Sequence, residues 1–234
     1  MEIRALHFDV FGTVVDWRES IAREAAKLLS SKGVDCDWHA FADAWRSRYQ
    51  PAMEEVRSGR RGWAKLDDLH RENLDAVLDE FGISRVDDTD LDHLNMAWHR
   101  LDPWPDAVAG MNRLKRNYIL VTLSNGNVSL MVDMAKRAGL PWDAVLGAEV
   151  VGAYKPQPEA YLRNAELLGL KPEECLMVAA HNGDLDAAGT LAYRTAFVFR
   201  RTEHGPNQST DLEPTGDYDF VAEDFLDLAD KLGC

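Results

Sequence analysis

The stretch Ile3-Arg4-Ala5-Leu6-His7-Phe8-Asp9-Val10-Phe11-Gly12-Thr13-Val14-Val15 decides the fold, because a short apolar run ends there at an acid and then turns through Gly-Thr. A run of about four to eight apolar, β-favouring residues before a glycine turn is typical of a buried strand. Open α/β sheets bind their ligands at the carboxyl ends of the strands, which is where Asp9 falls. A buried carboxylate is costly unless it has a partner or a task. Asp9 is therefore a candidate functional residue, and the alternative is an Asp that caps the next helix.

The composition limits the class of protein. The 234 residues suffice for one large domain, or for a main domain with a smaller inserted one. Asp and Glu total 40 against 26 Lys and Arg, and the formal net charge of −14 argues against binding to nucleic acid or to an anionic membrane. Three widely spaced cysteines favour reduced thiols in a cytoplasmic protein over disulfides or zinc. The sequence contains neither a signal peptide pattern nor the roughly 20 apolar residues that a membrane helix needs.

A helical insertion is predicted after the first strand. Helical spacing of apolar residues predicts helices over residues 18–31, 38–59, 66–81 and 88–100, and Pro51 is expected to kink or split the second. Residues 101–105 contain two prolines in three positions, which predicts a linker that cannot continue a helix. We therefore expect a core domain formed by residues 1–14 and 101–234, and a helical domain formed by residues 15–100.

Strand and helix patterns alternate from residue 106 onward. Strands are predicted near residues 118–123, 145–151, 175–180, 195–199 and 220–221, with helices between them, and residues 200–218 are predicted to form a polar loop. Strands separated by helices of about ten to fifteen residues are typical of βαβ units. The predicted fold class is α/β, with a Rossmann-like, mainly parallel sheet, helices on both faces and the helical insertion.

Polar residues follow four of the predicted strands and should meet at one edge of a parallel sheet. They are Asp9, Gly12 and Thr13; Ser124, Asn125 and Gly126; Tyr154 and Lys155; and His181, Asn182 and Asp184. Each has an ordinary alternative, such as a helix cap for Asn125 or a solvated surface side chain for Lys155. Tyr161, in the first turn of the following helix, leans back toward Lys155 or is a partly buried core residue. The joint placement of these residues indicates a site.

Four segments carry a resemblance to a known superfamily. Asp9-Val-Phe-Gly-Thr13, Leu123-Ser-Asn-Gly126, Tyr154-Lys-Pro156 and His181-Asn-Gly-Asp184 resemble, in order and spacing, the four motifs of the haloacid dehalogenase superfamily. The resemblance extends over essentially the whole chain, and the helical insertion is similar to the cap domain of that superfamily. Within it the chain looks most like the L-2-haloacid dehalogenases. Phosphatases of the superfamily have a second Asp at the position of Phe11, which protonates the leaving alcohol; a benzyl side chain donates no proton, and a halide needs none.

The resemblance implies a hydrolase that needs no metal and no cofactor. It would convert short (S)-2-haloalkanoic acids into (R)-2-hydroxyalkanoic acids through an aspartyl ester, with fluoroacetate among the candidate substrates. Two alternatives stay open: a magnesium-dependent phosphatase of the same superfamily, and a member without catalytic activity. Asp186 lies at a spacing that matches the additional magnesium ligands of the phosphatases poorly. Family members are often dimers, so a homodimer is compatible with the sequence.

The resemblance also implies roles for individual residues. Asp9 would be the nucleophile, Lys155 would hold it ionised, and Asp184, together with Lys155, would activate the water that hydrolyses the ester. Thr13 and Ser124 would orient the nucleophile and the carboxylate of the substrate. Tyr161 would support Lys155.

The halide and the rest of the substrate would be bound by Val10, Phe11, Arg46, Asn125, His181 and Asn182. Arg46 follows Trp45 in the second predicted helix, as the halide-binding Arg of the family follows a Trp. Taken without the resemblance, it is a surface Arg beside an apolar stripe. His181 stands where the best-known relatives have Asn, and Gly183 stands where they have an aromatic residue, so the preferred halogen stays open.

Overall fold

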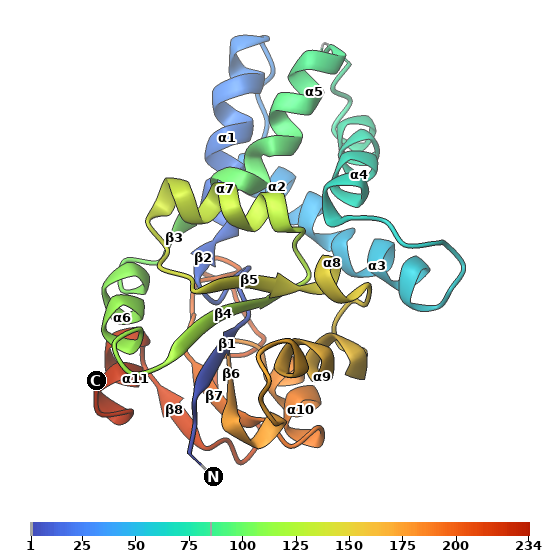
Figure 1. Ribbon diagram of the computed structural model, residues 1–234. Helices are drawn as coiled ribbons and strands as arrows, with labels where there is room; N and C mark the ends of the chain where they lie inside the picture. The colour runs from blue at the N-terminus through green and yellow to red at the C-terminus, as the bar shows by residue number, and fades with distance from the viewer. Residues whose placement is uncertain (1, 85) are drawn as a thin grey trace. The chain divides into compact units, whose positions relative to one another are not determined.

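The computed structural model describes residues 2–84 and 86–234, which form two compact units (Figure 1). One contains residues 1–16 and 102–234, and the other contains Trp17–Leu101. The boundaries follow Asp16 and Leu101, slightly later in the chain than predicted. Val15–Asp16 (β2) and Asp102–Pro103 (β3) pair with each other as a two-stranded antiparallel sheet, which keeps both segments in the larger unit.

The larger unit is built on a six-stranded parallel sheet with the order β5-β4-β1-β6-β7-β8 (Figure 1). Its strands are Ala5–Phe8 (β1), Ile119–Ser124 (β4), Ala144–Gly147 (β5), Cys175–Ala179 (β6), Arg194–Val198 (β7) and Phe220–Ala222 (β8). The predicted α/β class is confirmed. All four residues of β1 are buried, so the opening apolar run is a central strand. The order of the strands changes direction between β1 and β6, and such a switch point is where open α/β sheets bind ligands.

Helices cover both faces of this sheet. On one face, Pro158–Leu167 (α9) and Asn182–Thr190 (α10) enclose a core that includes Tyr161, Met177 and Leu185. The other face carries Ala107–Leu114 (α6), Val128–Ala138 (α7) and Phe225–Lys231 (α11) (Figure 1). There the ring of Phe8 packs edge-on against Trp142 and Phe225. The sheet is therefore buried on both sides, which explains the continuous apolar runs of its central strands.

The smaller unit is helical. Its helices are Trp17–Ser31 (α1), Trp38–Ser47 (α2), Tyr49–Arg57 (α3), Leu66–Glu80 (α4) and Asp88–Asn95 (α5), followed by the 3₁₀ turn Met96–Arg100 (η1). Trp45 is fully buried and packs edge-on against Phe41 and Trp98. In the described part of the chain, no helix combines the length and the apolar character that crossing a membrane requires.

Two segments differ from their predicted structure. Residues 148–151 form a helical turn (α8, Ala148–Val151), because the chain leaves β5 at Gly147, whose φ is 129° and whose Cβ would lie 2.3 Å from the Ser124 carbonyl oxygen. The predicted helix 38–59 is divided at Arg48 and not at Pro51. Pro51 lies in the first turn of α3, where a missing N–H breaks no helical hydrogen bond.

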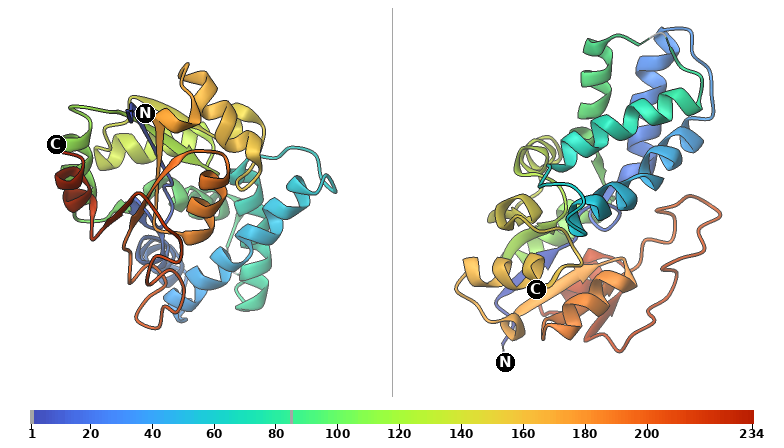
Figure 2. Two further views of the ribbon diagram at one scale, coloured as in Figure 1. Left: turned by 90° about the horizontal axis from the view of Figure 1, so that it is seen from below. Right: turned by 90° about the vertical axis from the view of Figure 1, so that its right-hand side faces the viewer.

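The connection between β7 and β8, residues 199–219, is a long loop, drawn in orange-red on the right of the right-hand view in Figure 2. Asn182, the first residue of α10, holds it. The Asn182 side-chain amide donates to Asp211 at 2.8 Å and accepts from the Thr215 N–H at 2.8 Å and from the Tyr218 hydroxyl at 3.0 Å. The loop is thereby fixed beside the carboxyl edge of the sheet.

Candidate active site

Asp9 follows β1 at the carboxyl edge of the sheet and is only 7% exposed. The Thr13 hydroxyl donates to Asp9 Oδ2 at 2.7 Å and accepts from the Ala180 N–H at 2.9 Å. Gly12 turns the chain between them with a φ of 85°, a conformation that strains other residues. The order Asp, Gly, Thr in the sequence therefore folds a hydroxyl onto the carboxylate.

Two side chains, the partly buried Trp104 and the buried Arg200, bind the backbone of this turn, residues 9–14. Trp104 Nε1 donates to the Gly12 carbonyl at 2.8 Å, and Arg200 Nε donates to the Thr13 carbonyl at 2.8 Å. Both terminal nitrogens of Arg200 also bind the carboxylate of Asp106, at 2.8 and 2.9 Å. The turn that carries Asp9 is thus supported by side chains from two other parts of the unit.

Lys155 links two carboxylates. Lys155 Nζ lies 2.9 Å from Asp9 Oδ1 and also contacts Asp184 Oδ2, while the Lys155 N–H donates to Asn125 Oδ1 at 2.8 Å. The Tyr161 hydroxyl donates to Asp184 Oδ1 at 2.6 Å, so Tyr161 supports Lys155 by way of Asp184. Burial and the neighbouring Asp184 raise the pKa of Tyr161 above its usual range, which keeps the hydroxyl a donor.

His181 links Asp9 to a residue that the sequence analysis missed. His181 Nδ1 lies 3.1 Å from Asp9 Oδ2, and His181 Nε2 lies 2.8 Å from Glu203 Oε2. Glu203 belongs to the loop after β7, and its side chain is 2% exposed. The predicted site residues follow four of the strands, and none of them follows β7, which ends at Val198. The same rule applied to that strand leads to Glu203.

Carboxylates and cations alternate along the site in the order Asp184, Lys155, Asp9, His181, Glu203. Burial alone would raise the pKa of Asp9, but Lys155 and His181 outweigh it and hold that pKa well below its usual range. Burial lowers the pKa of Lys155 and of His181, and their carboxylate neighbours outweigh this and raise both. Asp9 is therefore ionised at neutral pH, and the Lys155 ammonium beside it is positively charged.

Four further predicted residues lie in the larger unit with other contacts. Ser124 is buried and its hydroxyl accepts from the Gly126 N–H at 3.1 Å. Val10 and Phe11 are buried in the turn. The amide of Asn182 binds the loop after β7, and its contact with the substrate or halide stays a prediction.

Arg46 lies in the other unit. Its guanidinium carbon stands 4.0 Å from the centroid of the Tyr49 ring and 5.4 Å from that of Trp17. These contacts hold the side chain over two aromatic faces, an arrangement that Arg favours. Its role at the halide stays a prediction.

Asp186, considered above as a magnesium ligand, accepts a hydrogen bond from the Tyr218 hydroxyl at 2.9 Å. Over residues 2–84 and 86–234, no group of three or more His, Cys, Asp or Glu side chains could hold a metal ion. Independence from metal stays a prediction that activity measurements must test.

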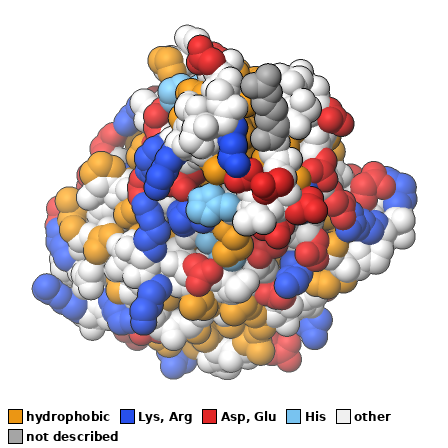
Figure 3. Space-filling model, turned by 90° about the horizontal axis from the view of Figure 1, so that it is seen from above, with side chains coloured by type: hydrophobic (Ala, Val, Ile, Leu, Met, Phe, Trp, Pro, Cys, Tyr) orange, Lys and Arg blue, Asp and Glu red, His pale blue; other side chains and the backbone are white. Residues whose placement is uncertain are grey.

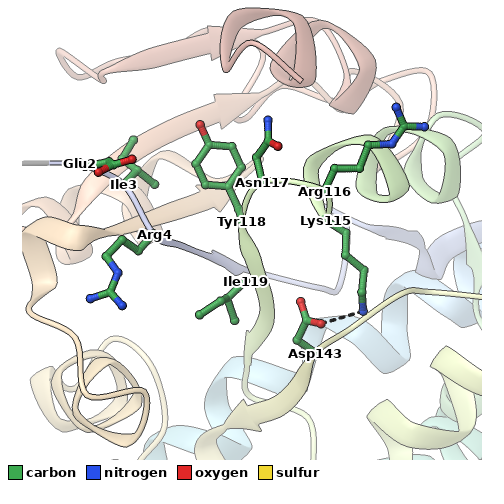
Figure 4. Close-up of a pocket in the computed structure, with 9 residues that line it drawn as sticks. All are labelled: Glu2, Ile3, Arg4, Lys115, Arg116, Asn117, Tyr118, Ile119 and Asp143. Atoms are coloured by element: carbon green, nitrogen blue, oxygen red, sulfur yellow. Dashed lines mark ion pairs between the residues drawn. The ribbon is translucent and has the colours of Figure 1, made fainter.

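A hollow lies at the opposite edge of the sheet, before β1 and β4. This open pocket has a volume of about 490 Å³ and is lined by Glu2, Ile3, Arg4, Lys115, Arg116, Asn117, Tyr118, Ile119 and Asp143 (Figure 4). Lys115 pairs with Asp143 at 2.8 Å, and Arg4 pairs with Glu174 at 3.3 Å. Two of its three basic side chains are thus compensated. On the face drawn in Figure 3, acidic and basic side chains are likewise interspersed.

The fold and the site define a class: a parallel α/β protein with an ionised, cation-flanked carboxylate at the end of its central strand. The model of the haloacid dehalogenase-like hydrolases matches residues 3–189. (S)-2-haloacid dehalogenase 1 of Pseudomonas sp. (strain CBS-3) is 30% identical over 203 residues, which are 85% of each chain. The chain belongs to the haloacid dehalogenase-like hydrolase family.

Two solved structures are more similar still. The crystal structure of the defluorinating L-2-haloacid dehalogenase Rha0230 is 52% identical, with a TM-score of 0.97 over 99% of this chain and 96% of that one. The L-2-haloacid dehalogenase PA0810 is 48% identical, with a TM-score of 0.95 over 99% of both chains. These relatives share the fold over nearly the full length of the chain.

Proposed function

We propose that the chain hydrolyses the carbon–halogen bond of short (S)-2-haloalkanoic acids and forms (R)-2-hydroxyalkanoic acids without a metal ion. The observation that carries the proposal is the ionised Asp9, held between Lys155 and His181 at the end of β1. The names of relatives that cover most of the chain support the substrate class. Rha0230, 52% identical, is called defluorinating, which supports fluoroacetate as a substrate.

In the first half of the reaction, a carboxylate oxygen of Asp9 attacks the carbon that bears the halogen. The new carbon–oxygen bond forms as the carbon–halogen bond breaks, and the halide leaves with the bonding electron pair. Attack from the side opposite the halogen inverts the configuration at that carbon. Phe11 suits this chemistry, because a departing halide needs no proton from the enzyme. Arg46 and Asn125 are the proposed donors to the halide.

In the second half, water attacks the carboxyl carbon of the aspartyl ester. Asp184, held by Lys155 and Tyr161, takes a proton from that water. The bond between the carboxyl carbon and the alkylated oxygen then breaks, and this oxygen leaves as the hydroxyl of the product with the proton from Asp184. The regenerated carboxyl of Asp9 releases its proton, so one proton and one halide are formed per turnover.

The first experiment measures free halide from (S)-2-chloropropionate, chloroacetate and fluoroacetate in the presence of a chelator. We expect release that matches the formation of the 2-hydroxy acid and is unchanged by the chelator. The matched control is Asp9→Asn, which preserves the shape of the side chain and should reduce turnover by at least roughly a thousandfold. Mass spectrometry must exclude deamidation of the new Asn. Absence of halide from all three substrates would overturn the proposal.

A single turnover in ¹⁸O-labelled water, with enzyme in excess, tests the ester. The heavy oxygen should enter Asp9, because the product takes its hydroxyl oxygen from the enzyme. Label found directly in the product would mean that water attacks the substrate carbon and would exclude the ester. Magnesium-dependent release of phosphate from a phosphate monoester would instead favour the phosphatase alternative, and Phe11→Asp should then increase it.

Location and assembly are further proposals. Cys36, Cys175 and Cys234 are free thiols, which supports a reducing, cytoplasmic environment. A homodimer is proposed from the family resemblance alone. Sedimentation equilibrium measures it directly.

A further inference from the structure

Both ring nitrogens of His181 face carboxylates. His181 Nδ1 lies 3.1 Å from Asp9 Oδ2, and His181 Nε2 lies 2.8 Å from Glu203 Oε2. An ionised carboxylate only accepts hydrogen bonds, whereas a neutral imidazole has one donor and one acceptor nitrogen. A neutral ring would therefore direct a lone pair at one of the two carboxylates. The two contacts are satisfied together by the imidazolium, which donates from both nitrogens.

Glu203 is built into the site. Its side chain is 2% exposed, although a buried carboxylate is costly unless it is paired. Its carboxylate also packs against the turn that carries Asp9: a Cβ at Gly12 would lie 2.0 Å from Glu203 Oε1. The lack of a Cβ at Gly12 thus leaves room for the Glu203 carboxylate beside this turn. Glu203 is therefore held in place within hydrogen-bonding distance of His181 and can influence the protonation state of the imidazole.

His181 lies on the side of the nucleophile and not of the leaving group. In an in-line displacement the halide departs from the side of the carbon opposite the attacking oxygen. A ring nitrogen that is hydrogen-bonded to the attacking carboxylate is therefore not a donor to the halide. The predicted halide contact of His181 does not fit this geometry, so another role is needed.

The two oxygens of Asp9 differ in their donors. Oδ2 is bound by the Thr13 hydroxyl at 2.7 Å and by His181 Nδ1, while Oδ1 is bound by Lys155 Nζ. After one oxygen has been alkylated, the other is the carbonyl oxygen of the ester. Negative charge develops on this carbonyl when water adds to the carboxyl carbon, and two converging donors stabilise such a charge.

We propose that Glu203 is a positioning residue that keeps His181 an imidazolium, so that His181 and Thr13 together bind Asp9 Oδ2 as the oxyanion of ester hydrolysis. This inference rests on the proposed function and refines its second half. As water adds, the π electron pair of the carbonyl moves to Oδ2. As the intermediate collapses, the pair returns, the bond from the carboxyl carbon to Oδ1 breaks, and Oδ1 leaves with the product and the proton from Asp184.

The charges that face His181 come from several elements. Asp9 lies after β1, Glu203 lies after β7, and Lys155 and Asp184 reach His181 only through Asp9. His204 Nε2 stands 3.7 Å from Glu203 Oε1 on the outer side. Glu203 is thus the acid next to His181 that does not take part in the reaction, and its charge can be removed without removing the nucleophile.

The test uses Glu203→Gln with (S)-2-bromopropionate, whose good leaving group makes ester hydrolysis the slower half. Gln keeps an acceptor for His181 Nε2 and removes the charge. We expect the alkaline limb of turnover to move to lower pH by about one unit or more. Above that limb, about one halide per site should still appear in a burst, while turnover falls roughly a hundredfold and the ester on Asp9 accumulates in quenched samples.

Two matched variants separate charge from structure. Glu203→Asp retains the charge and should restore most of the pH profile of the original enzyme. Glu213→Gln removes an exposed charge from the same loop and should leave the profile unchanged. Equal pH profiles for Glu203→Gln and the original enzyme would overturn the proposal.

A second measurement does not depend on any variant being active. In ¹⁵N-histidine-labelled enzyme, the two ring nitrogens of His181, assigned by their loss in His181→Gln, should both be protonated at pH 8. A neutral His181 at that pH would overturn the inference, whatever the activity. If the original enzyme releases no halide, the proposed function fails, while the charge of His181 is still decided by this spectrum.

Discussion

The two sides of Asp9 are built alike but differ in one respect. On each side a basic side chain contacts one oxygen of Asp9 and also contacts a second carboxylate: Lys155 with Asp184, and His181 with Glu203. The neighbouring acids raise the pKa of Lys155 further above an already high value, so its charge is fixed. The charge of His181 depends on its neighbours, because the ordinary pKa of a histidine is near neutral.

This difference suggests a division of labour around one carboxylate. The positive charge of Lys155 helps to hold the pKa of Asp9 well below its usual range. The charge of His181 depends on the carboxylates beside it, and Glu203 is the one of these that does not react with the substrate. Variants that alter the Lys155 side or the His181 side test this difference, and the variant with the largest expected effect comes first.

Replacing the fixed cation should have the largest effect. Lys155→Met removes the charge between Asp9 and Asp184 and leaves two largely buried carboxylates close together without a cation. Halide release should fall by roughly a thousandfold or more, and the free energy of unfolding should fall by about 3–5 kcal/mol. Urea unfolding and halide assays measure the two effects. The control Lys136→Met, at an exposed position of α7, should leave halide release unchanged and should change the free energy of unfolding by no more than about 0.5 kcal/mol. Full activity in Lys155→Met would contradict the proposed role of Lys155.

The second prediction concerns the space on the His181 side. Gly12→Ala places a Cβ 2.0 Å from Glu203 Oε1 at a φ of 85°, and it should lower the free energy of unfolding by about 1–3 kcal/mol and slow turnover. The contrasting variant is Gly183→Ala in α10, where a Cβ has open space; it should stabilise the protein by about 0.5–1 kcal/mol. Thermal unfolding compares the pair. Combining Gly12→Ala with Glu203→Ser should recover part of the loss, and strictly additive effects would argue against the clash.

The third prediction concerns the pH dependence of stability. The acids beside His181 raise its pKa in the folded protein above the ordinary value of 6.5. A raised folded-state pKa stabilises the fold below the unfolded-state value, and this contribution is lost as the pH rises through the folded-state value. The stability difference between the original protein and His181→Gln should therefore be greatest below pH 6.5 and should shrink at alkaline pH. Denaturant titrations at several pH values measure it, and a difference that grows with pH would show the opposite sign.

The smallest effect is expected away from both sides. Asp186→Asn retains an acceptor for the Tyr218 hydroxyl and should leave halide release within about twofold, with or without a chelator. A decrease in halide release greater than about tenfold, or a new dependence of halide release on magnesium, would favour a metal-dependent reaction.

Local pattern was sufficient for most of the Asp9 site. Parallel strands bring their carboxyl ends to one edge. Residues that follow β1, β6 and the predicted strand 145–151 could therefore be expected to lie together. The contacts of Asp9 with Thr13, Lys155 and His181 have this origin. A run of apolar residues also predicted most strands, but it gave no warning that Gly147 ends β5 before Val150 and Val151.

Contacts between distant segments could not be predicted in this way. Asn182 binds backbone and side chains of a loop about 30 residues further on, and a polar loop sequence does not indicate which of its residues return to the site. Glu203 differs, because it follows β7 at the carboxyl edge of the sheet, where the rule for strand ends reaches it. The division between α2 and α3 at Arg48 has no local signal in the sequence, and Pro51 is no guide to it because proline is tolerated in the first turn of a helix.

The loop after β7 has its anchors at its two ends. Arg200 and Glu203 hold the beginning, and Asn182 holds Asp211 and the residues that follow. The segment between Pro206 and Thr210 is mostly exposed and lies between the two anchors. Because each end of the loop is held separately, a reporter peptide inserted in this exposed segment should leave the contacts around Asp9 intact. The tip offers a point of attachment for immobilising the enzyme or for following it by fluorescence.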